Sequence, residues 1–413
     1  MSPFLQLSIA LVVIITAAKL GGYLSYRIGQ PAVLGELLAG LVLGPSVLDF
    51  LHWPLFSGEA HVGETIAELA ELGVLLLMFI AGLDLHLSDL ARSGRVSALA
   101  GTLGVVTPVA LGFGVGRLFG LDAETALFLG LILAATSVSI SAQTLMELGV
   151  LRSRVGISLL GAAVFDDILV VLGLSVFIAL FAGSAAEAAG LSGVALILVR
   201  MVGFLVVGTG LGFWLVPRLS RQVDRMPISQ GLISFTFVVT LLYGWASEVL
   251  GSMAAITGAF LAGLVFARSQ LKERIQAGMS TLAYGVFVPI FFVNIGLAAN
   301  ARELTGESLL FLAVLVLAAV VSKVLGAGLG ARLGGLGNRE ALQLGVGMMS
   351  RGEVGLIVAT VGINNGVVGE DIFAEVVGVV ILTTLLTPPL LRSLFAERPT
   401  QTSVQEEPLG EAS

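Results

Sequence analysis

Long apolar stretches follow one another along almost the whole chain, and they constrain its fold more than any other feature. Most are close to the roughly 20 residues that an α-helix needs to cross a bilayer. Only 12% of the 413 residues are charged and 56% are hydrophobic, whereas a soluble domain carries about 25% charged residues. Because the stretches are continuous and do not alternate at period two, we expect an all-α polytopic membrane protein and not a β-barrel.

A window of about 20 residues divides the chain into thirteen predicted spans. They cover residues 4–26, 31–49, 63–85, 96–118, 123–147, 153–182, 190–217, 228–248, 250–268, 278–299, 307–332, 340–363 and 370–395. An N-terminus outside and a C-terminus in the cytoplasm place most of the 21 lysines and arginines in cytoplasmic connections. The outer connections are then acidic, in agreement with the positive-inside rule.

Charge and composition exclude several classes of function. The net charge is −7 and the chain has no basic block, which argues against nucleic acid as a partner. The absence of cysteine excludes disulfides, thiol catalysis and thiolate metal sites. Glycine-rich runs at 208–212 and 326–330 lie inside predicted spans, so they indicate close helix packing and not nucleotide binding.

Two short motifs recur seven spans apart. LAGLV occurs at 38–42 and again at 261–265, and Ala-Leu-X-Leu-Gly occurs at 126–130 and 341–345. Because seven is odd, the second copy of each motif enters the membrane from the opposite side. Inverted repeats of this kind are typical of secondary transporters, in which the ion site lies near the midplane where broken helices meet.

Two adjacent carboxylates in the sixth span are the strongest candidates for chemistry. Asp166 and Asp167 interrupt an apolar run, at a depth where a charged side chain costs about 2.5–3.5 kcal/mol on insertion scales. Neighbours on a helix point about 100° apart, so one can face a cation pathway while the other meets a fixed partner. Lys323, alone in the eleventh span, is the expected partner, in a pair that is either permanent or altered during turnover.

Two spans carry sequences that predict an interrupted helix. Arg351 and Glu353 flank a glycine in the twelfth span, and Thr136 and Ser137 occupy the equivalent place in the fifth. Two crossed, broken helices present free carbonyl and N–H groups at the midplane. Those carbonyls, with the oxygens of Thr136 and Asp167, suit a hard monovalent cation. We expect Arg351 and Glu353 to neutralise the helix ends.

In combination these motifs resemble the cation:proton antiporter-2 family, and within it the NapA-type bacterial sodium/proton antiporters. The resemblance rests on the Asp-Asp pair, the intramembrane lysine, Arg-Gly-Glu in the twelfth span and GELLAGLVLGP at 35–45. It covers the chain to about residue 395. It implies an NhaA/NapA-like antiporter fold of about 13 helices, with two inverted six-helix repeats, two crossed discontinuous helices and a homodimer in the bacterial inner membrane.

The resemblance also implies a division of the chain. The expected parts are a dimerisation scaffold of residues 1–89 and 227–300, a core transport unit of 90–183 and 301–395, and a linker helix within 184–226. Residues 396–413, which are polar and acidic, are expected to form a disordered cytoplasmic tail.

Individual residues match positions of the family motifs. Asp167 matches the carboxylate that binds the cation and the proton, and Asp166 matches the acid that pairs with the lysine, here Lys323. Thr136 and Ser137 match the first helix break, with Thr136 as a second ligand of Na⁺. Family members of the potassium-efflux type usually have Gln-Asp in place of Asp-Asp and add a cytosolic nucleotide-binding domain, and neither feature is found here.

The expected activity is exchange of cytoplasmic Na⁺ or Li⁺ for external H⁺, electrogenic at two H⁺ per Na⁺, by elevator-type alternating access. We expect neither an enzyme nor a cofactor. One alternative is exchange of K⁺, or of any monovalent cation, for H⁺. Another is a cation channel, which needs an open pathway lined by rings of carbonyls or charges. An intramembrane aspartyl protease needs its two carboxylates on separate elements, whereas Asp166 and Asp167 are consecutive.

Overall fold

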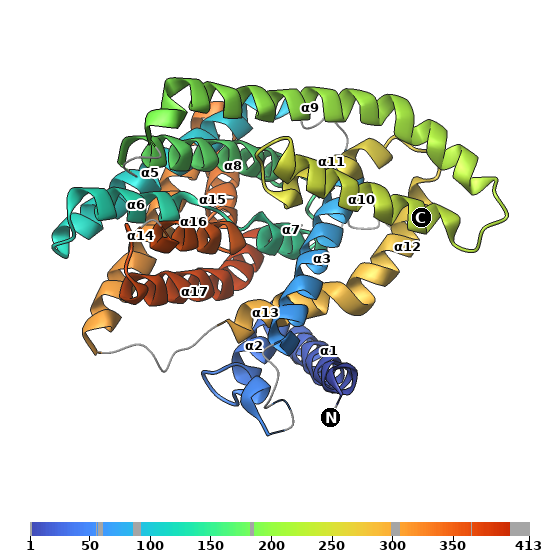
Figure 1. Ribbon diagram of the computed structural model, residues 1–413, viewed down its shortest axis with the longest axis horizontal. Coiled ribbons are helices and arrows are strands. Elements are labelled where there is room, and N and C mark those ends of the chain that lie inside the picture. The colour runs from blue at the N-terminus through green and yellow to red at the C-terminus, as the bar shows by residue number, and fades with distance from the viewer. Residues whose placement is uncertain are drawn as a thin grey trace, which may run out of the picture.

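A computed structural model of the chain describes residues 2–54, 56, 61–85, 92–181, 186–298, 306–364 and 366–396, and this part is helical throughout (Figure 1). Of the predicted tail at 396–413, residues 397–413 lie outside the described residues. The elements are α1 (Pro3–Arg27), α2 (Ala32–Leu43), η1 (Phe50–His52), α3 (His61–Asp84), α5 (Gly94–Leu118), α6 (Ala123–Ala134), α7 (Val138–Glu147), α8 (Arg154–Phe181), α9 (Ala186–Asp224), α10 (Gly231–Val249), α11 (Ala255–Phe266), α12 (Lys272–Leu282), η3 (Ala283–Phe287), α13 (Val288–Leu297), α14 (Gly306–Gly334), α15 (Asn338–Gly347), α16 (Glu353–Asn364) and α17 (Glu370–Phe395).

Ten helices of the described chain are long and apolar enough to cross a membrane, with α6 and α7 counted as one. Three shorter apolar helices cover residues Ala32–Leu43, Ala255–Phe266 and Val354–Ile363. Each of these helices overlaps one of the predicted spans. The all-α polytopic class is confirmed. The number of segments that cross the bilayer, thirteen, stays a prediction.

The repeated LAGLV motif falls on two 12-residue helices, α2 and α11. A Cβ added at Gly40 in α2 would collide with the carbonyl oxygen of Val293 in α13. A Cβ at Gly263, the same place in the second copy, would collide with the carbonyl oxygen of Phe79 in α3. Each glycine therefore lets two backbones touch, which is how helices pack closely in lipid.

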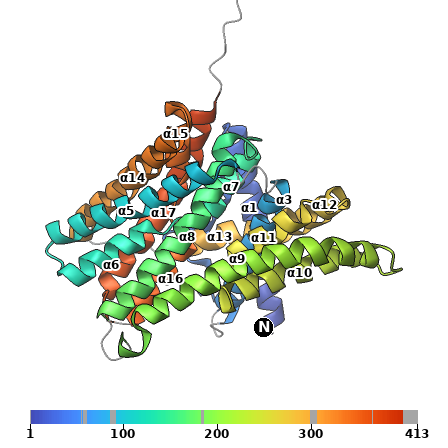
Figure 2. The same ribbon diagram turned by 90° about the horizontal axis from the view of Figure 1, so that it is seen from above.

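The helices form two groups joined by α9. In one group α5 packs against α14, α6 and α8; in the other α3 packs against α11 and α13. Figure 2 shows α9 running along both groups, and it contacts α8 as well as α10 and α11. Most of α9 is exposed at the surface of the chain, whereas most of α6 and α7 is buried. The segment formed by α6 and α7 therefore lies in the interior of the protein.

A carboxylate from one group caps a helix of the other. Glu147, the last residue of α7, accepts hydrogen bonds from the backbone N–H groups of Ala32 (2.5 Å) and Val33 (3.2 Å) in the first turn of α2. The Gln143 side-chain amide donates to the same carboxylate at 2.8 Å. Pro31 at the N-cap provides no side-chain cap. Glu147 thus satisfies amides that otherwise have no partner within their helix.

A lysine bridges three elements of the second group. The Lys19 ammonium in α1 donates to the carbonyl of Tyr284 at 2.9 Å and lies 3.6 Å from a carboxylate oxygen of Glu36 in α2. Tyr284 belongs to the π-helical turn Ala283–Phe287, where the i→i−4 ladder is interrupted. The cation therefore neutralises a buried acid and binds a carbonyl at a defect of the helix.

We predict that Glu147→Gln lowers the free energy of unfolding by about 1 kcal/mol, because the amide keeps the shape but loses the charge at a helix N-terminus. The measurement is the melting temperature of the purified protein in detergent. Glu273→Gln is the matched control, since Glu273 lies in the first turn of α12 and is exposed. An equal shift in both variants would contradict the capping role.

Candidate functional site

The two predicted helix breaks are present, and they touch each other. The first separates the end of α6 at Ala134 from the start of α7 at Val138, and the second separates α15 from α16. The N–H of Ser137 donates to the carbonyl of Ser350 at 2.9 Å, and the Ser350 hydroxyl donates to the carbonyl of Ser137 at 2.7 Å. Each break therefore satisfies backbone groups that the other exposes, as a membrane interior requires.

Glycine is needed at the second break for reasons of space. A Cβ at Gly352 would collide with the side chain of Ser137. The hydroxyl of Ser141, one turn into α7, also donates to the carbonyl of Gly347 at the end of α15. Small and hydroxylated residues let the crossing chains approach and bond.

Arg351 ties the second break to a neighbouring helix. Its guanidinium is almost fully buried and donates to the carbonyls of Met348 (3.3 Å) and Met349 (2.9 Å), just after α15 ends. It also donates to the carbonyl of Ala319 in α14 at 2.8 Å. The positive charge thus lies at the negative end of a helix dipole. Glu353 is the first residue of α16, and its side chain lies outside the described part of the structure.

Threonines of α17 complete the second break. The N–H of Arg351 donates to the hydroxyl of Thr383 at 3.1 Å, and the hydroxyl of Thr384 donates to the carbonyl of Arg351 at 2.8 Å. Both threonines are buried. Side chains from a third helix therefore hold the interrupted backbone in place.

The structure brings Asp166 and Lys323 into direct contact. Lys323 Nζ lies 2.6 Å from Asp166 Oδ1, and both side chains are completely buried. The pair joins α8 to α14 beside α5, where a Cβ at Gly104 would lie 3.6 Å from Lys323 Nζ. The ammonium group therefore lies close to the backbone of α5, between the three helices.

The other oxygen of Asp166 is poorly satisfied. Oδ2 is buried and has no hydrogen-bond partner among the described residues. The Thr136 hydroxyl interacts with this carboxyl group, but it donates a long hydrogen bond, 3.5 Å, to the carbonyl of Ala134. The first helix break therefore reaches the buried ion pair, and one carboxylate oxygen keeps capacity to accept a proton or another donor.

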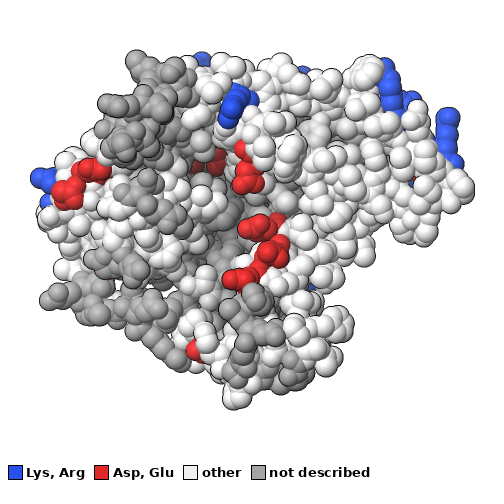
Figure 3. Space-filling model, viewed as in Figure 1, with Lys and Arg blue, Asp and Glu red and all other residues white. Residues whose placement is uncertain are grey.

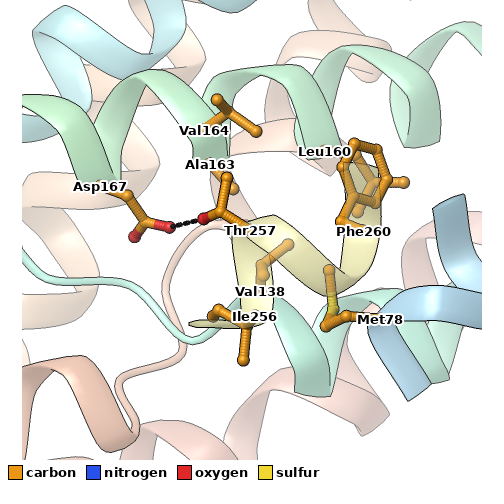
Figure 4. A pocket seen from close by; sticks show the side chains of 9 residues that line it. All are labelled: Met78, Val138, Leu160, Ala163, Val164, Asp167, Ile256, Thr257 and Phe260. Atoms are coloured by element: carbon orange, nitrogen blue, oxygen red, sulfur yellow. Dashed lines mark hydrogen bonds between the residues drawn. The ribbon is translucent and has the colours of Figure 1, made fainter. Parts of the chain in front are cut away.

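Asp167 has different surroundings from its neighbour. It is 6% exposed and lines a cavity of about 10 Å³, close to the room that one water molecule needs (Figure 4). Its Oδ2 accepts a hydrogen bond from the hydroxyl of Thr257 at 3.2 Å. The remaining lining is apolar: Met78, Val138, Leu160, Ala163, Val164, Ile256 and Phe260.

Thr257 is the site residue that the sequence did not reveal. It lies on α11, outside every motif discussed above, and a single threonine in an apolar span is common. Only the placement of α11 beside α8 gives it a role. The repeat of LAGLV four residues later marks the helix but not this side chain.

Larger cavities lie on both sides of the Asp167 cavity. One of about 320 Å³ is lined by Glu71 of α3, Glu248 of α10 and Asn294 of α13, and it shares Ile256 with the Asp167 cavity. Figure 3 shows acidic side chains gathered in the central hollow of one face, while lysines and arginines lie toward its margins. The second cavity, about 560 Å³, is lined by Asp84, Glu147 and other polar residues at the opposite end of α3.

Fold and site together define a class: a polytopic secondary transporter built on two contacting broken helices, with ionisable side chains buried beside them. Residues 12–396 match the family described as "Sodium/hydrogen exchanger, transmembrane". The chain belongs to this family, and it is accordingly a cation/proton exchanger and not an enzyme.

Several relatives align over nearly their whole length. "Probable Na(+)/H(+) antiporter GerT" of Bacillus cereus is 39% identical, over 93% of this chain and 98% of that protein. "Na(+)/H(+)-K(+) antiporter GerN" of the same organism is 38% identical, over 94% and 96%. A structure of the antiporter MjNhaP1 from Methanocaldococcus jannaschii superposes with a TM-score of 0.72 at 18% identity, over 95% and 96% of the two chains. At that identity the likeness supports the fold alone.

We predict that removing one member of the buried ion pair is more damaging than removing both. Lys323→Met leaves an uncompensated buried carboxylate, and such a change typically lowers the free energy of unfolding by about 3–5 kcal/mol. The combined Asp166→Asn and Lys323→Met variant leaves no charge and should recover most of that stability. Melting temperatures of the two single variants and the double variant in detergent give the coupling. Additive losses would contradict a direct interaction.

Proposed function

We propose that this protein expels Na⁺ from the cytoplasm in exchange for external H⁺, and that Asp167 is the carboxylate at which the two compete. The observation that carries the proposal is the unequal neutralisation of two adjacent acids. Asp166 is paired at 2.6 Å with Lys323, whereas Asp167 accepts from a neutral hydroxyl beside a small cavity. In this proposal, the charge of Asp167 is the one that a Na⁺ ion or a proton neutralises in turn.

Oxygen ligands near the breaks supply the rest of a cation site in this proposal. Thr136 and Ser137 lie at the first break, close to the ion pair and to Ser350. Na⁺ is a hard cation that favours hydroxyl, carbonyl and carboxylate oxygens. Thr136 with Asp167 forms the proposed Na⁺ site, and Arg351 with Glu353 compensates the broken helix ends.

Movement of one helix group against the other provides access from both sides. We assign α5–α8 and α14–α17 to a moving core, α1–α3 and α10–α13 to a dimeric scaffold, and α9 to the link between them. The two large cavities lie between these groups, on either side of Asp167. A shift of the core, of the elevator type, exposes Asp167 to one cavity and then to the other.

A second proton explains how the membrane potential assists export. If Lys323 and Asp166 release and regain one proton per cycle in addition to Asp167, two H⁺ enter for each Na⁺ that leaves. One net positive charge then moves inward in each cycle, and the membrane potential contributes about 2.3 kcal/mol per 100 mV to the export of Na⁺. We place the protein in the bacterial inner membrane with its N-terminus outside.

The choice of cation has one competing candidate. GerN, at 38% identity, is named for exchange that includes K⁺, so K⁺/H⁺ exchange, or exchange of any monovalent cation, is the second function to test. A channel is disfavoured, because the cavity at Asp167 is about 10 Å³ and interrupts any open path between the larger ones.

The main test is collapse of a preset pH gradient in proteoliposomes on addition of Na⁺, Li⁺ or K⁺, followed with a pH-sensitive dye. Wild type should respond to Na⁺ in a saturable way, and Asp167→Asn should abolish the response because no charge remains to bind a cation. A response to K⁺ alone would move the protein to potassium exchange. Linear, non-saturating flux would favour a channel.

The stoichiometry has its own test. Asp166→Asn should keep Na⁺-dependent exchange but lose most of its dependence on an imposed membrane potential, because the second proton is no longer carried. The measurement compares initial rates at 0 and about −100 mV, set with K⁺ and valinomycin, for which one net charge corresponds to about 2.3 kcal/mol. Unchanged voltage dependence in this variant contradicts the role of Asp166.

A further inference from the structure

Thr257 and Asp167 belong to different helix groups. Thr257 lies in the first turn of α11, next to α3, while Asp167 lies midway along α8, next to α5 (Figure 4). Their hydrogen bond, 3.2 Å from Thr257 Oγ1 to Asp167 Oδ2, is buried on both sides. A polar contact at the proposed ion site therefore crosses the boundary between the two groups.

The hydroxyl of Thr257 bonds a carboxylate of another helix and not a carbonyl of its own helix. Other buried threonines in helices, such as Thr240 and Thr387, donate to the carbonyl four residues earlier in their own helix. Thr257 is the third residue of α11, so the residue four places earlier precedes the helix. Its hydroxyl donates instead to the carboxylate of another helix, a hydrogen bond that is stronger when the acceptor is charged.

The position of the bond matters for access to Asp167. Ile256 lines both the 320 Å³ cavity and the cavity at Asp167, whereas Thr257 lines only the latter. Thr257 thus lies one residue beyond the floor of the larger cavity. A cation that reaches Asp167 from this side meets the Thr257 hydroxyl as the polar group already on the carboxylate.

The strength of the contact depends on what Asp167 carries. An ionised carboxylate accepts the hydrogen bond fully, because both its oxygens hold negative charge. A proton or a Na⁺ ion on the carboxylate withdraws that charge and competes for the same oxygen. The bond between the groups is accordingly strongest when the site is empty and weakest when it is loaded.

We infer that Thr257 is a positioning residue that holds the empty, charged Asp167 against α11 and so suppresses movement of the unloaded core. The inference rests on the proposed exchange function and on the two groups moving relative to each other. Proton movement is strictly coupled to Na⁺ movement only if the core does not move across the membrane while Asp167 carries neither ion. If it crosses, protonated Asp167 moves in one direction and ionised Asp167 returns, and the cycle carries H⁺ alone.

The test is the rate at which proteoliposomes lose a pH gradient with no Na⁺, Li⁺ or K⁺ present, using choline salts and a protonophore-free membrane. Thr257→Val keeps the shape and removes the donor, and we expect its Na⁺-independent H⁺ leak to be about tenfold faster than wild type, the value of one hydrogen bond to a charged group. Thr257→Ser retains the hydroxyl and should restore wild-type tightness. Thr257→Ala should leak like the valine variant, and it covers the case in which valine prevents folding.

Two controls make the result specific. Thr240→Val removes an equally buried hydroxyl from α10 that bonds only within its helix, and it should not leak. Adding Asp167→Asn to Thr257→Val should reduce the leak, because the proton carried by Asp167 is lost. An undiminished leak in this double variant overturns the inference, as does a leak in the serine or Thr240 variant.

The inference and the proposed function fail in different ways. If Thr257→Val shows no added H⁺ leak but a raised apparent KM for Na⁺, Thr257 is a cation ligand and the positioning role is overturned. The exchange activity of the wild type is unaffected by that result. Absence of cation-dependent exchange in wild type would instead remove the proposed function. The inference is also overturned if Thr257→Val and Thr257→Ala both show the wild-type H⁺ leak and the wild-type rate of Na⁺/H⁺ exchange.

Discussion

The two helix breaks impose the constraint on which the rest of this structure depends. Backbone groups freed inside a membrane have no water to bond, so they must find partners within the protein. Ser137 and Ser350 bond each other, Arg351 bonds the carbonyls after α15, and threonines of α17 take the remaining groups. Central burial of α6 and α7 follows from this need, and the ionisable side chains lie beside the breaks because the same polar centre shields them.

Two adjacent aspartates have different surroundings because their helix turns them toward different neighbours. Asp166 points to Lys323 on α14, and Asp167 points to Thr257 on α11. In the proposed mechanism, the acid that faces a lysine and the acid that faces a neutral hydroxyl together bind one monovalent ion at a time. A second lysine near Asp167 would compete with Na⁺, and a missing Lys323 would leave a buried charge without compensation.

The sequence predicts the elements of this protein better than the contacts between them. Spans, breaks and the pairing partner of Asp166 follow from hydropathy, from the Arg-Gly-Glu and Thr-Ser sequences, and from the cost of a lone buried charge. Thr257 and Glu147 do not, because a hydroxyl in an apolar run and an acid at a helix end are ordinary until a second helix is placed against them. LAGLV is intermediate: its repetition is visible in the sequence, but the close backbone contact that requires Gly40 and Gly263 is visible only in three dimensions.

Both polar contacts between the helix groups described above have the same chemical form. Glu147 and Asp167, on α7 and α8, are the acceptors, and neutral donors on α2 and α11 are the partners. A neutral donor is less costly to separate from a carboxylate than a buried counter-ion, because no second charge is left behind. The buried pair of Lys323 with Asp166 lies within one group, where separation is not required. An ion pair that joins the groups, Arg152 with Asp84 at 2.8 Å, has an exposed arginine that water can solvate. Neutral donors at these two buried or partly buried contacts suit the proposed mechanism, in which the two groups separate and rejoin in each cycle.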